Sequence, residues 1–224
     1  MRRWLLFIVV VTLLVSACGQ DKKQNSFGID VSHHNGNINW EQVPEDVEFV
    51  YVKATEGATY VDPMYQQNIK GARAKKLRVG AYHYFRTTNS VQKQFENYKL
   101  HVKKSDIELI PMVDVEECRK WSTMQFQDSL MRFIQLVKSH YGKAPMIYSV
   151  NTFYNKYCAP KFNNYYLMIG RYGNEEPFIK GRGAYTIWQN SQTGRLAGIP
   201  KNVDIDIFRK NASIRDILLN DLVE

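Results

Sequence analysis

Two carboxylates separated by one valine are the most reactive grouping in this sequence. Asp114 and Glu116 flank Val115 at the end of an apolar run over 107–115 that predicts a β-strand. Because side chains alternate along a strand, the two carboxylates would point the same way, with Cα atoms roughly 6.5 Å apart. Two carboxylates on a buried face cannot both stay ionised cheaply, so one should have a raised pKa. A protonated acid beside an ionised partner suits glycoside hydrolysis, in which one group protonates the leaving oxygen and the other stabilises the oxocarbenium-like transition state.

Such a pair is weak evidence alone, because an acidic strand end can equally face solvent or bind a cation. Polar residues also stand at the ends of other strand-like runs. They include Asp30, Lys53, Tyr82, Tyr148, Gln189 and Asp204. In barrels of parallel strands, the reacting groups lie at the C-terminal ends of the strands. The pattern therefore favours a site at one end of a barrel.

The elements that would position these residues alternate along the chain. Predicted strands lie at 27–31, 48–54, 78–85, 107–115, 145–150, 165–170, 184–189 and 203–208, and predicted helices lie at 63–76, 89–103 and 122–141. The segments that join the last three strands are too short or too rich in glycine for full helices. We therefore expect an α/β fold, a modified TIM-like (β/α) barrel with about five β/α units and three further strands. An open doubly wound sheet is the alternative, although no GxGxxG or P-loop motif follows a strand.

Seven short motifs resemble, in type and order, those of family 25 of the glycoside hydrolases, the bacterial and phage N-acetylmuramidases called lysozymes. The matching residues are 27–32 with 35–36, 51–57, 80–85, 111–116, 147–149, 187–189 and 203–206, and together they span about 27–209. The resemblance implies a modified barrel, in agreement with the order of elements. It also implies hydrolysis of the β-1,4 bond between N-acetylmuramic acid and N-acetylglucosamine in the glycan strands of peptidoglycan.

The resemblance assigns four acidic residues to the catalytic site. Glu116 matches the general acid, and Asp114 matches the carboxylate that assists attack of the substrate's 2-acetamido group on the anomeric carbon. Asp30 and Asp204 match two further acids of the pocket floor, which would orient substrate or water. Asp206 departs from the family pattern, in which Asn is commoner, so Asp204 is the preferred site residue. The choice between a covalent and a substrate-assisted mechanism stays open.

Aromatic and polar residues at the strand ends would complete a sugar site. Substrate contacts are expected from Lys53, Glu56, Tyr82, Tyr84, Tyr148, Trp188 and Gln189. Aromatic rings with polar tips are suited to stacking on pyranose rings. For Tyr84 and Glu56, a purely packed or paired role is equally plausible.

Neither a metal nor a cofactor is expected. His33 and His34 are adjacent, so their side chains point apart, and neither belongs to an HxxxH pattern. Metal-dependent deacetylation of polysaccharide is disfavoured for this reason. The other alternative is a non-catalytic, glycan-binding envelope lipoprotein, but binding alone does not need a buried carboxylate pair.

The N-terminus has the features of a lipoprotein leader. Arg2 and Arg3 precede a 12-residue apolar run over 4–15, which is shorter than the ~20 residues that a membrane-spanning helix needs. Residues 15–18, Val-Ser-Ala-Cys, resemble a bacterial lipobox, which implies lipid on Cys18. We expect a signal peptide over 1–17, a lipidated tether over 18–26 and a catalytic domain over 27–219. The protein would then be exported and held at an envelope membrane by its lipid.

Charge and cysteine usage limit the partners. The net charge of +8 is spread over scattered lysine pairs, which favours anionic envelope polymers over nucleic acid as a partner. Export permits a disulfide between Cys118 and Cys158, but sequence separation says nothing of their spatial distance, so the pairing stays open. We expect a monomer.

Overall fold

Eight strands lie side by side in a closed ring. The computed structural model describes residues 27–220, so the predicted leader and the whole predicted tether, Cys18 included, lie outside the described residues. The ring order is β1 (Phe27–Val31), β9 (Val203–Phe208), β8 (Ile187–Gly194), β7 (Leu167–Gly170), β6 (Met146–Val150), β5 (Met112–Asp114), β4 (Arg78–Tyr84) and β2 (Val47–Glu56). Pairing of β1 with β2 closes the ring, which confirms the barrel and excludes the open sheet.

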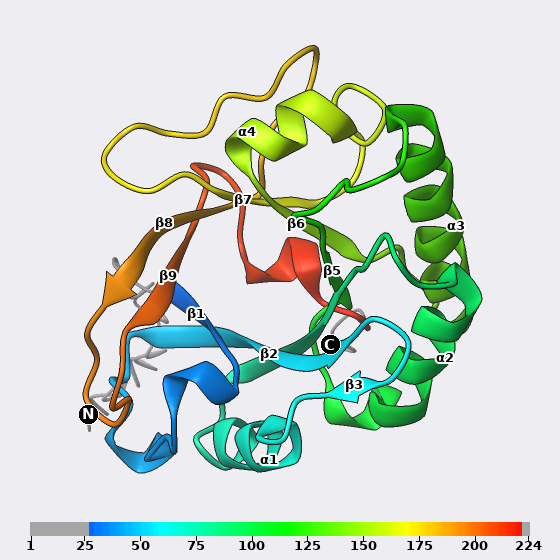
Figure 1. Ribbon diagram of the computed structural model, residues 1–224. Coiled ribbons are helices and arrows are strands. Elements are labelled where there is room, and N and C mark those ends of the chain that lie inside the picture. The colour runs from blue at the N-terminus through cyan, green and yellow to red at the C-terminus, as the bar shows by residue number, and fades with distance from the viewer. Residues whose placement is uncertain (1–26, 221–224) are drawn as a thin grey trace, which may run out of the picture.

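Strand direction changes only in the last part of the barrel. Neighbouring strands are parallel except β9, which runs antiparallel to both β1 and β8. The short β3 (Tyr60–Val61) pairs with β2 outside the ring. The helices α1 (Tyr65–Ala74), α2 (Val91–His101) and α3 (Thr123–Tyr141) lie outside the barrel, whereas no α-helix of residues 27–220 lies beside β8 and β9 (Figure 1). The degenerate end expected from short connections is therefore present.

The helix α3 shows why these sequences form these elements. Its capping box is present, since Ser122 Oγ accepts from the Gln125 backbone N–H and the Gln125 side chain accepts from the Ser122 N–H. Gly142, in the left-handed conformation with φ of 94°, ends the helix. The apolar stripe is buried against the barrel: Phe126, Leu130, Phe133, Ile134, Val137 and Tyr141.

Shorter elements complete the chain. The segment after β6 forms α4 (Asn151–Phe153) and a π-helical turn over Tyr154–Cys158. Single 3₁₀ turns lie at His33–Asn35, Trp40–Gln42, Lys104–Asp106 and Ile214–Ile217. No helix within 27–220 is long and apolar enough to cross a membrane.

Large aromatic residues fill one end of the barrel, so it is not a pore. A Cβ atom on Gly28 would lie 2.0 Å from Phe49 Cζ, and one on Gly80 would lie 2.3 Å from Tyr51 Cε1. Glycine is therefore required where these rings cross the interior. Tyr51 Oη donates to the Ile110 carbonyl over 3.1 Å. The plugged end leaves the opposite end, where the parallel strands finish, available for a site.

The bounds of two predicted strands differ most from those in the structure. The run over 107–115 contains only three strand residues in β5, and Leu109 forms a single bridge to Leu218 instead. Strand β8 continues five residues beyond the predicted end at 189, because β9 folds back on it as an antiparallel partner. Hydrophobicity alone does not reveal either partner.

Candidate active site

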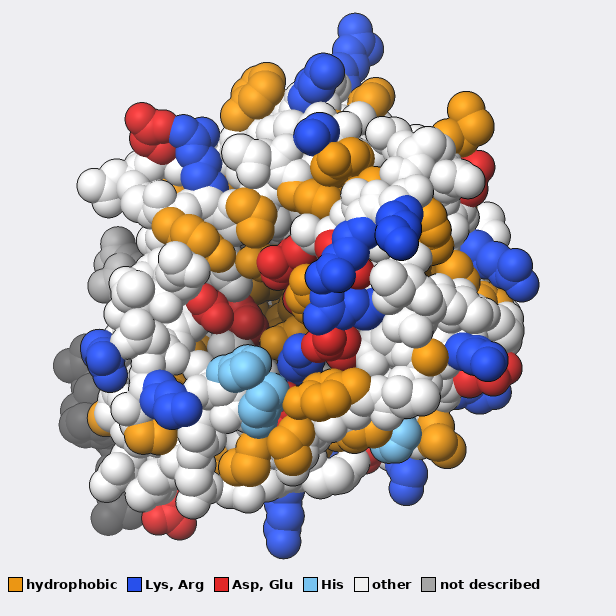
Figure 2. Space-filling view, viewed as in Figure 1, with side chains coloured by type: hydrophobic (Ala, Val, Ile, Leu, Met, Phe, Trp, Pro, Cys, Tyr) orange, Lys and Arg blue, Asp and Glu red, His pale blue; other side chains and the backbone are white. Residues whose placement is uncertain are grey.

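The carboxyl ends of the parallel strands surround an open cavity of about 830 Å³. Most of the predicted site residues line it: Asp30, Lys53, Tyr82, Tyr84, Asp114, Glu116, Tyr148, Gln189 and Asp204. Figure 2 shows acidic side chains inside a hollow near the middle of this face, with histidines at its edge. The cavity lies where barrels of this class hold their reacting groups.

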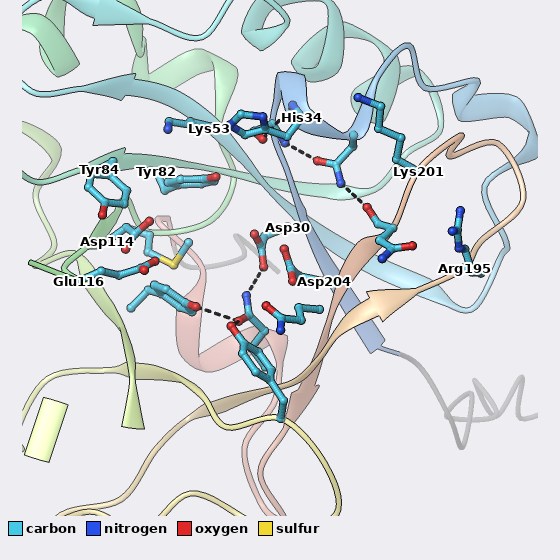
Figure 3. Close-up of a pocket in the computed structure, with 18 of the residues that line it drawn as sticks. Asp30, His34, Lys53, Tyr82, Tyr84, Asp114, Glu116, Arg195, Lys201 and Asp204 are labelled. Carbon is cyan, nitrogen blue, oxygen red and sulfur yellow. Dashed lines mark hydrogen bonds between the residues drawn. The ribbon is translucent and has the colours of Figure 1, made fainter. Parts of the chain in front are cut away.

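Asp114 and Glu116 share this cavity but differ in exposure. Asp114 is 6% exposed and ends β5, whereas Glu116 is exposed to solvent. Glu116 lies beyond the strand, but the Val115 N–H donates to the Tyr148 carbonyl over 3.0 Å and continues the pairing. Both carboxyl groups therefore reach the same space (Figure 3).

The raised pKa falls on Asp114, although the general-acid assignment predicts it for Glu116. Burial raises the pKa of Asp114 well above its ordinary range, and the charge and hydrogen bonding of Glu116 raise it further. Asp30 contributes a smaller effect in the same direction. The pair can therefore hold one proton between two carboxyl groups, with Glu116 on the solvent side.

Asp30 is held by a chain of side-chain hydrogen bonds. Gln189 Nε2 donates to Asp30 Oδ2 over 2.7 Å, and Tyr148 Oη donates to Gln189 Oε1 over 2.8 Å. Tyr172 Oη donates to the same amide oxygen over 3.2 Å. Burial and the charge of Asp204 raise the pKa of Asp30 despite the bond from Gln189. This chain orients both Asp30 and the Tyr148 ring.

Strand β9 contributes two further carboxyl groups. Burial, followed by the charge of Glu116, raises the pKa of Asp204 to about 6. Asp206 is fully buried one inward position further along the strand, opposite Gly28 and Gln189. Neither Asp206 oxygen has a hydrogen-bond partner, and burial raises its pKa well above the ordinary range. The residue that departs from the family pattern therefore faces inward, next to the site.

An ion-pair network continues from the cavity to the loop after β5. Lys53 Nζ lies 2.7 Å from Glu56 Oε2, and Arg86 Nε donates to Glu56 Oε1 over 2.8 Å. Arg86 Nη1 lies 2.7 Å from Glu117 Oε2, and Arg119 Nε lies 3.0 Å from the same oxygen. Glu56 is therefore committed to ion pairs and is not among the residues that line the cavity. The network ties β2 and β4 to the residue that follows Glu116.

Residues that the sequence did not indicate, such as Tyr172, Arg86 and Glu117, belong to this region, whereas two predicted substrate contacts, Glu56 and Trp188, do not line the cavity. Tyr172 lines the cavity two residues after β7, a strand-end position that could have indicated it. Arg86 and Glu117 also follow strand ends. Trp188 does not line the cavity, because side chains alternate along β8 and its neighbour Gln189 points inward. Its Nε1 donates to the Arg171 carbonyl over 2.6 Å instead.

The expectation that the side chains of His33 and His34 point apart is wrong, because their ring centroids lie 3.8 Å apart. His33 Nδ1 lies 2.7 Å from Asp62 Oδ2, whereas His34 lines the cavity. His83 is buried between Thr55 and Gln94, and burial lowers its pKa to about 4, so it is a hydrogen-bonded residue of the barrel wall. Within the described part of the chain, no three His, Cys, Asp or Glu side chains are grouped so as to hold a metal ion.

Both remaining cysteines are free thiols in the structure. Cys118 is half-buried in the loop after β5, and Cys158 is buried in the π-helical turn. The Cys118–Cys158 disulfide that the sequence left open is therefore not formed in this structure.

Comparison with known proteins places this chain among cell-wall hydrolases and their relatives. A family model described as Glycosyl hydrolases family 25 matches residues 29–199. The uncharacterized protein YegX of Escherichia coli strain K12 is 32% identical over 196 residues, which cover 85% of this chain and 71% of YegX. The autolytic lysozyme of Clostridium acetobutylicum is 30% identical over 182 residues, covering 81% of this chain and 55% of that protein. The bacterial lysozyme from Streptomyces coelicolor superposes with a TM-score of 0.77 at 27% identity, covering 87% of this chain and 96% of that one.

Proposed function

Because this chain belongs to family 25 of the glycosyl hydrolases, we propose that it cleaves the β-1,4 bond between N-acetylmuramic acid and N-acetylglucosamine in peptidoglycan. It is a glycosidase of the lysozyme type that hydrolyses peptidoglycan. The observation that carries the finer proposal is the convergence of Asp30, Asp114, Glu116 and Asp204 on one open cavity. An open cavity at the barrel end suits a polymer that must pass through the site.

In this proposal, Glu116 is the general acid. Its exposed carboxyl group donates a proton to the glycosidic oxygen as the bond to the anomeric carbon breaks. The carbonyl oxygen of the substrate's 2-acetamido group attacks that carbon and forms an oxazolinium. Because the pair's single proton lies on Glu116 when the substrate is bound, Asp114 is a carboxylate that accepts a hydrogen bond from the acetamido N–H and stabilises the positive charge. Water then attacks the anomeric carbon while the Glu116 carboxylate accepts its proton.

The remaining cavity residues would bind and orient the sugars. Asp30 is held by Gln189 and is placed to position the acetamido group or the attacking water, and Asp204 would act beside it. Tyr82, Tyr84 and Tyr148 offer aromatic faces to pyranose rings. Lys53, whose Nζ lies 5.2 Å from the centre of the Tyr84 ring, would contact hydroxyl groups at this edge.

The identity of the new reducing end tests the proposal. Purified peptidoglycan would be digested and reduced with borohydride, and the reduced sugar identified by mass spectrometry. Reduced N-acetylmuramic acid supports the proposed bond, whereas reduced N-acetylglucosamine would reject it. Glu116→Gln serves as the control for contaminating hydrolases. An inactive wild type that still binds peptidoglycan would indicate the non-catalytic alternative.

We also propose that the protein acts as a monomer tethered to an envelope membrane. The support is the leader over 1–17 and the lipobox-like tetrapeptide that ends at Cys18. The tether over 18–26 is polar, and the catalytic domain over 27–219 follows it directly. A short tether would confine hydrolysis to glycan strands near the membrane surface.

A further inference from the structure

One edge of the cavity carries cations that the proposed chemistry does not use. Arg195 and Lys201 line the cavity from the connection between β8 and β9. Figure 3 shows them on one side, Asp114 and Glu116 on the opposite side, and Asp30 with Asp204 between. The cavity therefore has an acidic catalytic side and a basic edge.

The segment over 195–202, which carries both cations, is held by hydrogen bonds to residues that follow β1. The Asn39 N–H donates to the Gly198 carbonyl over 2.8 Å, and Asn35 Nδ2 donates to the Asn202 carbonyl over 2.7 Å. Gly198 has a φ of 81°, and a Cβ atom there would lie 2.3 Å from the Asn39 carbonyl oxygen. The backbone between the two cations is therefore held against the segment after β1.

The two cations differ from the third cation in the cavity. Lys53 is committed to its ion pair with Glu56. Within residues 27–220, no ion pair joins Arg195 or Lys201 to an acidic side chain, and both residues are exposed. The acidic floor repels an anionic group of the substrate, so such a group would settle at this edge.

We propose that Arg195 and Lys201 bind the carboxylates that muramic acid carries in peptidoglycan. This inference rests on the proposed function and names a part of the substrate beyond the sugar rings. Each muramic acid bears a lactyl group that ends in a carboxylate or in an amide-linked stem peptide, and the stem peptide has carboxylates of its own. Both sources offer the same chemistry, and arginine and lysine are suited to it.

The test compares Arg195→Ala/Lys201→Ala with a matched double variant, Arg182→Ala/Lys210→Ala. The control removes the same charge from exposed residues that do not line the cavity. Three soluble substrates are used: peptidoglycan fragments with stem peptides, the same fragments after amidase treatment, and fragments whose carboxylates have been coupled to methylamine. Exposed charge pairs contribute little individually, so we expect KM to rise about three- to tenfold at low ionic strength.

The fragments coupled to methylamine, which have no carboxylates, provide the decisive comparison. On these fragments, the Arg195/Lys201 variant should equal the wild type, and on native fragments its defect should shrink at high salt. On fragments with stem peptides the lactyl carboxyl is an amide, so a defect there identifies the carboxylates of the stem peptide. A defect on amidase-treated fragments identifies the lactyl carboxylate that the amidase frees, and either result supports the proposal. A defect no larger than that of the control, or one that persists on coupled fragments, would overturn it.

A binding measurement separates this proposal from the proposed function. Sedimentation with insoluble peptidoglycan is measured for Glu116→Gln with and without the Arg195 and Lys201 substitutions. Weaker binding of the triple variant supports carboxylate recognition even if the wild type releases no reducing ends. Equal binding of the two proteins contradicts it even if hydrolysis is confirmed.

Discussion

At the scale of single residues, four carboxyl groups of the cavity differ in their access to water. Asp114 is buried and holds a proton readily, whereas Glu116 is exposed and can meet a glycosidic oxygen. The difference in burial therefore gives Asp114 and Glu116 different roles.

The first prediction separates the roles of Glu116 and Asp114. Glu116→Gln keeps the side-chain size but cannot donate a proton to the leaving oxygen, so kcat should fall by at least ~10² while the protein folds and binds glycan. Asp114→Asn should also be slow. On substrates with good leaving groups, the defect of Glu116→Gln should shrink and that of Asp114→Asn should persist. Wild-type turnover by a folded Glu116→Gln enzyme would refute the assignment.

The second prediction concerns Asp206 and the pH dependence of stability. Its pKa is raised in the folded state above the ordinary 3.8, so the folded state keeps a proton that the unfolded chain releases. The free energy of unfolding should therefore fall as pH rises from about 4 through the folded pKa. Asp206→Asn cannot ionise and should be more stable than the wild type at pH 8, by about 1–3 kcal/mol, with a smaller difference at pH 4.

Urea unfolding at pH 4, 6 and 8 measures this effect. The exposed Asp46→Asn serves as the control and should leave the pH dependence unchanged. Asp30, Asp114 and Asp204 also have raised pKa values, so Asp206→Asn should flatten the pH dependence without abolishing it. An Asp206→Asn protein with the wild-type slope would show that this carboxyl group does not hold the proton.

At the scale of elements, the loop after β5 depends on an anchor outside the cavity. Glu117 is 10% exposed at its side chain, and its carboxylate contacts Arg86 and Arg119. The Thr87 N–H donates to Glu117 Oε1 over 3.2 Å. Because Glu116 and Glu117 are adjacent, this anchor limits the positions that the Glu116 carboxyl group can reach.

The third prediction is that Glu117→Gln slows catalysis through this loop. Loss of the charge weakens the anchor, so kcat should fall about tenfold while KM changes little, because the sugar-binding residues lie on other strands. Amide hydrogen exchange should increase over 115–121. Arg119→Ala, which removes only an exposed partner, should have a much smaller effect on both measurements. A Glu117→Gln variant that raises KM without lowering kcat would contradict the positioning role.

At the scale of the whole molecule, closure of the barrel decides where the cavity lies, and the proposed membrane tether would decide where in the cell envelope it acts. Strand β1 pairs with β2 on one side and with β9 on the other. Asp30 therefore lies beside one strand from the start of the domain and one from its end. The cavity then lies at one end of the barrel, away from the aromatic plug. A lipid on Cys18 would keep that cavity within one short tether of the membrane.

The fourth prediction concerns this tether. Cys18→Ser should abolish lipid labelling and release the protein from the membrane fraction, because no other thiol precedes the catalytic domain. Globomycin, which blocks cleavage of lipoprotein leaders, should leave a larger unprocessed precursor in cells that express the wild type. Fractionation and metabolic labelling with palmitate measure both outcomes. Labelling that persists in Cys18→Ser would reject the lipoprotein assignment, and Cys118→Ser provides the control.

Local patterns in the sequence determined the elements and the type of chemistry. The apolar stripe of α3 repeats every 3.6 residues, and its capping residues Ser122 and Gln125 are three positions apart. Both can therefore be found from neighbouring residues in the sequence. Polar residues at strand ends were enough to expect a barrel with acids at one end. The resemblance to family 25 then identified Asp30, Asp114, Glu116 and Asp204, which lie together in the cavity.

Only the tertiary structure decided how each carboxyl group differs from the next. Burial of Asp206, exposure of Glu116 and the bond from Gln189 to Asp30, residues separated by 159 positions, depend on which strands become neighbours. For the same reason, Tyr172 lines the cavity and Trp188, a predicted substrate contact, does not. A pKa or a substrate contact depends on everything within a few ångströms of a side chain, and distance along the chain does not report that neighbourhood.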